Sequence, residues 1–240
     1  MYRPMTNELH EQWEARTRVV LQPIAAPSIL GLFGFAGATF MVSTYLAGWY
    51  HTANAPAYLF PFAAVFGGLA QFIAGLWCYR ARDGIGTAMH GMWGSFWMAY
   101  GLLWLLIVTH VLVAPPADGP FLPIAFWFIA LAAITAFGAI AALAESLALF
   151  LVLATLAAGS AVYAWSQVAG SHGGVVWGGW ILFISACIAF YTAGAMMVES
   201  AFGRVVFPLG KLHLRANVPG GVVTRPIEYE YGQPGVRAGQ

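Results

Sequence analysis

Very few side chains in this sequence are suited to binding another molecule, and most of these carry no charge. Gln71, Thr39 and Ser95 offer amide or hydroxyl groups from within long apolar runs, and such groups donate hydrogen bonds without a permanent charge. The stretch that begins at Pro27 adds backbone N–H groups, because the first N–H groups of a helix lack partners within it. For each side chain, a hydrogen bond to a neighbouring helix is the simpler alternative to contact with a bound molecule.

The titratable residues form no pattern typical of catalysis or metal binding. His90 has a side chain suited to relaying protons, and the alternative is a structural histidine near a membrane surface. His110 lies on the same apolar stretch, about 30 Å further along a helix, so the two histidines do not suit a single haem site. We therefore predict no enzyme active site, no cofactor, no metal site and no nucleic-acid partner.

The elements that carry these residues are predicted to be membrane-spanning helices. Of the 240 residues, 60% are hydrophobic and only 8% are charged, which is not typical of a soluble domain. Long intervals contain no Asp, Glu, Lys or Arg, and one span needs roughly 20 apolar residues. We expect an all-α, multi-pass membrane protein with six helices, near residues 28–49, 58–79, 85–111, 121–144, 146–168 and 176–198.

The basic residues predict how the chain is oriented. Every Lys and Arg lies before the first predicted helix, between the second and third, or after the last. Basic residues in short loops remain in the cytoplasm, so both termini are expected there. We predict a cytoplasmic tail at 1–23, a transmembrane domain at 24–212 and a second cytoplasmic tail at 213–240.

Glycines recur along the first predicted helix, at Gly31, Gly34 and Gly37. At 3.6 residues per turn they form a slanted stripe without side chains, and membrane helices pack closely through small residues. Partner surfaces are expected on the next two helices, at Gly67, Gly68 and Gly94. One interpretation is tight packing alone, and the other is packing that also lets a small solute pass close to the backbone.

Several motifs in order resemble a known family of membrane proteins. The stretches "SILGLFGF" (28–35), "FGGLAQFIAG" (66–75), "WGSFW" (93–97) and "FGRVVFPLG" (202–210) together resemble the acetate uptake transporter family. Its bacterial members include succinate/acetate permeases, and its fungal members were once proposed as ammonia exporters. The resemblance covers about residues 24–212. Two departures are plain: an Asn and a second Pro of the first-helix pattern are missing, and Trp93 stands where the family has Tyr.

The resemblance implies a protomer that conducts a small carboxylate, such as acetate or succinate, through its own helix bundle. It further implies a proton-linked transporter or an anion channel, assembled as a hexamer in the plasma (inner) membrane, with the carboxylate, a proton and the lipid bilayer as partners. A hydrophobic constriction maps by motif to Phe35, Trp93 and Leu153. On this interpretation the substrate path is lined by Gln71, Thr39, Ser95, Pro27 and Gly31, with His90 as a candidate proton relay.

Three alternatives are open at this stage, and one of them is a haem or redox subunit, which a purified sample without Soret absorption excludes. The missing Asn and Pro, together with Trp93, favour a non-transporting membrane scaffold or sensor with the same fold. Within transport, the alternative substrate is ammonia or another small neutral solute.

Overall fold

The computed structural model describes residues 24–52, 55–115 and 119–211. Within these residues, six helical segments are long and apolar enough to cross a membrane. They are α2 (Pro27–Leu46), a composite span (Ala55–Ala81), α5 (Gly84–Val108), α6 (Leu122–Ala142), α7 (Leu147–Ala169) and α8 (His172–Phe202). The prediction of an all-helical, multi-pass membrane protein with six spans is confirmed. The predicted tails at 1–23 and 213–240 lie outside the described residues.

Local capping groups explain the small differences between predicted and observed helix ends. The Ser171 hydroxyl accepts a hydrogen bond from Gly174 N at 3.2 Å, so α8 begins at His172 rather than near 176. At the other end of the same loop, α7 ends at Ala169 and is followed by the capping residue Gly170, whose φ of +60° favours glycine. These signals act over one turn and do not alter the hydrophobic pattern that predicted the spans.

The second span is a chain of three helical pieces rather than one uniform helix. It consists of α3 (Ala55–Phe62), the π-helix η1 (Ala63–Ala70) and α4 (Gln71–Ala81). Pro61 lies inside α3, where it cannot donate the backbone hydrogen bond of an ordinary helical residue. The wider π-helical turns follow directly and end at Ala70, immediately before Gln71, so η1 sets the direction in which the Gln71 side chain points.

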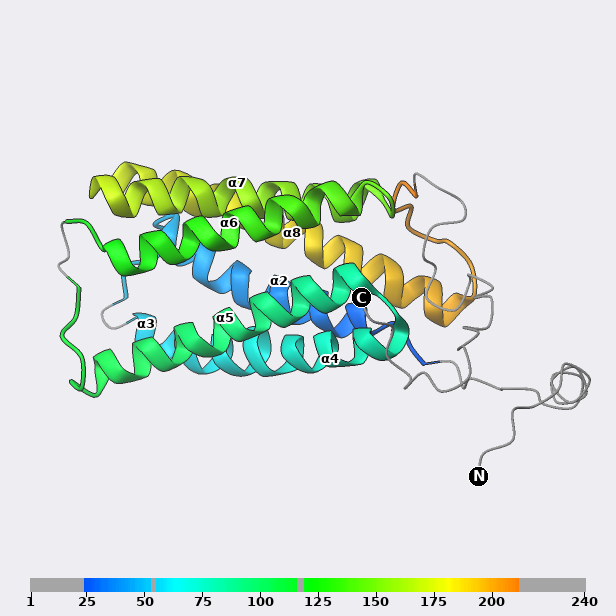
Figure 1. Ribbon diagram of the computed structural model, residues 1–240, viewed down its shortest axis with the longest axis horizontal. Helices are drawn as coiled ribbons and strands as arrows, with labels where there is room; N and C mark the ends of the chain where they lie inside the picture. The colour runs from blue at the N-terminus through cyan, green and yellow to red at the C-terminus, as the bar shows by residue number, and fades with distance from the viewer. Residues whose placement is uncertain (1–23, 53–54, 116–118, 212–240) are drawn as a thin grey trace, which may run out of the picture.

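Helix α2 lies in the middle of the bundle and contacts most of its neighbours. It packs against α8 on one side and against η1, α4 and α5 on the other. Figure 1 shows α4 and α5 on one side of α2, with α6 and α7 on the opposite side. We name the two ends of the bundle after a residue at each: the Asp83 end, where α2 and α5 begin, and the Gly170 end, where α7 ends.

Glycines allow α2 and its neighbours to approach at backbone distance. A methyl group on Gly34 would lie 2.6 Å from the backbone oxygen of Phe66, and one on Gly37 would lie 3.0 Å from the Phe66 ring. The other predicted packing glycines also lie against a neighbouring helix: Gly67 against Trp97, Gly68 against Met98 and Gly94 against Phe72. Close backbone contact of this kind is a main source of packing energy in lipid.

We expect Gly94→Ala to destabilise the protein. Its methyl group would lie 2.6 Å from the backbone nitrogen of Phe72, and a backbone atom cannot swing aside as a side chain can. Overpacking of this kind costs about 1–3 kcal/mol, so the thermal denaturation midpoint in detergent should fall. Gly194→Ala is the matched control, because nothing lies within 4 Å of its added methyl group. Equal midpoints for the two variants would contradict this account of the packing.

Candidate functional site

A small cavity lies inside the bundle, in the half nearer the Gly170 end. Its walls come from α2, α5, α6, α7 and α8 and include Thr39, Trp97, Tyr100, Phe128, Tyr163 and Leu182. The cavity has a volume of about 20 Å³, measured as the space that the centre of a water molecule can occupy. On the same measure a single water needs about 10–15 Å³. A solute larger than one or two waters therefore passes only after side chains move.

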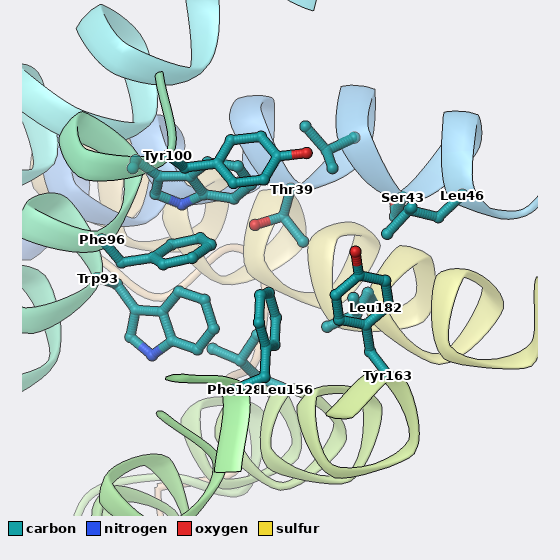
Figure 2. Close-up of a pocket in the computed structure, with 12 residues that line it drawn as sticks. Thr39, Ser43, Leu46, Trp93, Phe96, Tyr100, Phe128, Leu156, Tyr163 and Leu182 are labelled. Atoms are coloured by element: carbon teal, nitrogen blue, oxygen red, sulfur yellow. The ribbon is translucent and has the colours of Figure 1, made fainter. Parts of the chain in front are cut away.

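Two of the residues that line this cavity carry a buried polar atom without a partner among the residues that the structure describes. Thr39 Oγ1 and Trp97 Nε1 are buried and have no hydrogen-bond partner in the described part of the chain. Figure 2 shows the hydroxyl groups of Thr39 and Tyr163 directed toward the middle of the cavity. Buried polar groups are nearly always hydrogen-bonded, so these atoms are available to a polar molecule inside the cavity.

Apolar side chains close the cavity toward the Asp83 end. Phe35 lies about 6 Å beyond Thr39 along α2, and Leu153 about 4.5 Å beyond the cavity residue Leu156 along α7. The rings of Phe35 and Trp93 meet edge to face with centroids 6.1 Å apart. Phe35, Trp93 and Leu153 are exposed by 2%, 3% and 4% and belong to one hydrophobic cluster. We call these three residues the apolar plug.

A second polar site lies on the Asp83 side of the apolar plug. Gln71 Nε2 lies 3.5 Å from Nδ1 of His90, and Gln71 Oε1 is buried without a partner among the described residues. The His90 ring fills the notch at Gly31, where a methyl group would lie 2.5 Å from the imidazole. Gly31 is therefore the residue that makes room for a buried histidine next to Gln71.

The first turn of α2 lies beside a carboxylate rather than in an open passage. The Ser28 hydroxyl donates to Asp83 Oδ2 at 3.1 Å, and Gly86 N donates to Asp83 Oδ1 at 2.7 Å. Pro27 itself borders an outer groove together with Leu30 and other apolar residues. An anion near this helix start would meet the Asp83 charge, which offsets the attraction of the free N–H groups.

Ser95, another residue predicted to line the path, lies apart from the cavity. Its side chain is exposed on the outside of α5, and its hydroxyl donates to Gly91 O at 2.8 Å. The structure thus brings Thr39 to the cavity and gathers Gly31, Gln71 and His90 beyond the apolar plug. It places Ser95 and Pro27 elsewhere.

Three residues at the site are not among those that the sequence predicts. Trp97 and Tyr163 line the cavity, and Thr135 accepts a hydrogen bond from the indole nitrogen of Trp93 at 3.0 Å. Only Thr135 had a recognisable signal, because it carries the single hydroxyl group in the span 122–142.

A bundle of six apolar spans with a cavity, an apolar plug and polar groups on both sides of it defines a class of membrane protein. Here the helices enclose a small cavity, and the apolar plug closes it toward the Asp83 end. The chain belongs to the GPR1/FUN34/yaaH family, whose sequence profile matches residues 11–214. The family resemblance inferred from the motifs is confirmed.

Several proteins similar to this chain are named as transporters or channels. The succinate-acetate/proton symporter SatP of Escherichia coli is 27% identical over 190 residues, which cover 79% of this chain and 97% of that protein. The solved structure of the bacterial acetate channel SatP matches with a TM-score of 0.71 and 26% identity, over 78% of this chain and 99% of that chain. Ammonia transport outward protein 2 of Saccharomyces cerevisiae is 33% identical over 81 residues, 34% of this chain and 28% of that protein.

We expect Gly31→Ala and His90→Ala to be coupled. The methyl group of the first variant would lie 2.5 Å from the His90 ring, and removing that ring should relieve the clash. Side chains in direct contact typically show interaction energies of about 0.5–3 kcal/mol. Thermal denaturation midpoints of the wild type, both single variants and the double variant give this coupling. Strictly additive effects would show that the imidazole does not occupy the Gly31 notch.

Proposed function

We propose that this protein transports acetate and related short-chain carboxylates, such as succinate, across the plasma (inner) membrane. The passage runs inside each protomer, from the cavity through the apolar plug to Gln71 and His90. The observation that carries the proposal is this succession of polar, apolar and polar levels along the axis of one bundle. The named functions of SatP, a succinate-acetate/proton symporter and an acetate channel, support the substrate class.

The chemistry of the interior suits a passing anion. A carboxylate surrounded only by hydrocarbon is strongly disfavoured, whereas Thr39 and Trp97 on one side of the plug offer donors without a fixed charge. Gln71 offers an amide on the other side. Because the intervals 19–79, 84–117, 119–144 and 146–198 contain no Asp, Glu, Lys or Arg, no permanent charge along the proposed passage holds the anion as an ion pair.

We assign the protein no enzymatic activity, because the bacterial relative is named as a symporter and the solved structure as a channel.

The apolar plug is the gate in this proposal. Phe35, Trp93 and Leu153 must separate for a carboxylate to cross, since the cavity beside them is little larger than a water molecule.

For a proton-linked cycle, we propose His90 as the group that takes up the proton. It lies within one helical turn of Trp93 and next to Gln71, so a proton on its ring would reach a carboxylate that has passed the apolar plug. The other route for a proton is the undissociated acid, which carries it across without help from a side chain.

We further propose a homo-oligomer, with the hexamer that the family resemblance implies. Small residues occupy an exposed face of α5, at Gly84, Ala88, Ser95 and Ala99. Such a face permits close approach of a helix from another protomer, and it gives Ser95 a role outside the passage. Light scattering of the purified protein in detergent counts the copies, and a monomer would contradict this proposal.

A neutral solute such as ammonia is the second candidate substrate. The similarity to ammonia transport outward protein 2 and the water-sized cavity both favour it, because ammonia needs no widening of the cavity. Competition between the two solutes in one flux assay separates this candidate from the first.

We expect labelled acetate to enter liposomes that contain the purified protein. Thr39→Val and Gln71→Leu should each lower the uptake rate about fivefold, because one hydrogen bond contributes about 1 kcal/mol. Thr155→Val is the control, since its hydroxyl bonds only to backbone carbonyls of its own helix. A folded wild-type protein without flux of any carboxylate would instead favour the scaffold or sensor alternative.

The same liposomes, with and without a pH gradient, decide the coupling. A proton-linked transporter accelerates acetate uptake when protons also move inward, and His90→Gln should remove that acceleration while leaving downhill flux. If the pH gradient does not change the rate of acetate uptake by the wild type, the protein is a channel. His90 then has a structural role and does not relay a proton.

A further inference from the structure

The indole of Trp93 is tied to helix α6 by a directed hydrogen bond. Its Nε1 donates to Thr135 Oγ1 at 3.0 Å, and the Thr135 hydroxyl in turn donates to Leu131 O at 2.7 Å. Thr135 is completely buried. Because the hydroxyl proton is already given to Leu131, the Thr135 oxygen serves as the acceptor for Trp93.

This bond lies at the level of the apolar plug. Trp93 meets Phe35 with ring centroids 6.1 Å apart and Phe96 at 5.3 Å, and Phe96 meets Phe128 of α6 at 5.3 Å. Figure 2 shows the indole nitrogen of Trp93 directed away from the cavity. Helix α6 packs mainly on α7 and only lightly on α5, so the bond to Thr135 is a specific link between α5 and α6 beside the gate.

We propose that Thr135 is a positioning residue that sets the width and selectivity of the passage by holding the Trp93 indole against α6. The inference rests on the proposed carboxylate transport and deepens it. Trp93 fills the interior together with Phe35 and Leu153, so a carboxylate cannot cross while all three stay in place. Displacing the indole breaks its bond to Thr135, and a larger anion requires a larger displacement.

The buried, apolar surroundings favour the position in which the Trp93 indole is bonded to Thr135. A buried N–H without an acceptor is costly in an apolar interior, so the indole returns to Thr135 whenever no other acceptor is present. Once the indole has been displaced from Thr135, a carboxylate oxygen in the passage is such an acceptor. The Trp93 N–H therefore exchanges one acceptor for another during passage, and Thr135 determines the state to which the plug returns.

The test compares uptake of labelled acetate and succinate in liposomes. Thr135→Val keeps the shape of the side chain but removes the acceptor, so succinate uptake relative to acetate should rise about fivefold, the equivalent of one lost hydrogen bond. Thr135→Ser keeps the acceptor and should retain the wild-type ratio. Thr192→Val is the matched control, because the Thr192 hydroxyl is also buried but bonds to Ile188 O of its own helix.

A measurement without transport tests the bond itself. With ¹⁵N-labelled tryptophan, the indole N–H resonance of Trp93 is assigned by its loss in Trp93→Phe. This resonance should shift in Thr135→Val and keep its position in Thr135→Ser and Thr192→Val. An unchanged resonance in Thr135→Val would show that the bond does not hold the indole.

The outcomes separate this inference from the proposed function. If the wild type conducts no carboxylate, the proposed transport fails whatever Thr135 does. If the wild type conducts and Thr135→Val keeps the wild-type ratio, the role of Thr135 is overturned while transport stands. Should Thr135→Val not fold, Trp93→Phe removes the donor instead and should raise the same ratio; a wild-type ratio in that variant overturns the inference.

Discussion

The close approach of α2 to its neighbours is the constraint on which the rest of the structure depends. Lipid tails are as apolar as leucine, so helices in a bilayer are held by contact and hydrogen bonding rather than by exclusion of water. Methyl groups on Gly34 and on Gly179 would lie 2.6 and 2.5 Å from backbone atoms of Phe66 and Ala47. Because α2 touches η1, α4, α5 and α8, these contacts position every level of the interior.

Protein atoms fill the space beside each glycine of the stripe, as the tight-packing interpretation predicts. Gly34 and Gly37 serve packing, whereas Gly31 leaves room for the His90 ring beside Gln71. Along the axis of the bundle, the polar atoms of Thr39 and Gln71 lie on opposite sides of the layer that contains the Phe35 and Trp93 rings. None of these groups carries a permanent charge. In the proposed transport, such an arrangement would bind an anion weakly on either side of the gate, which is what rapid release requires.

The sequence predicted the number and placement of the spans because uncharged intervals of this length leave few other arrangements. It did not predict which face of each helix turns inward. These helices are apolar on all sides, so periodicity does not distinguish a face toward lipid from a face toward a neighbouring helix. The hydroxyl of Ser95 therefore suggests a position in the path, although its side chain is exposed. Phe35 and Trp93 were paired by family motif, whereas Trp97, Tyr163 and Thr135 become neighbours only when α5, α6 and α7 are assembled.

The π-helix η1 allows the two α-helical parts of the second span, α3 and α4, to turn different sides toward the bundle. Helix α3 buries only Ala55, whereas α4 buries Gln71, Ala74, Gly75 and Cys78. A π-helical turn holds more residues than an α-helical one, so the piece before η1 and the piece after it need not share a common inward side. Within one membrane crossing, α3 therefore has almost no buried face, whereas α4 turns a buried face toward the interior. Insertion or deletion of a single residue within η1 would rotate α3 relative to α4 about the helix axis.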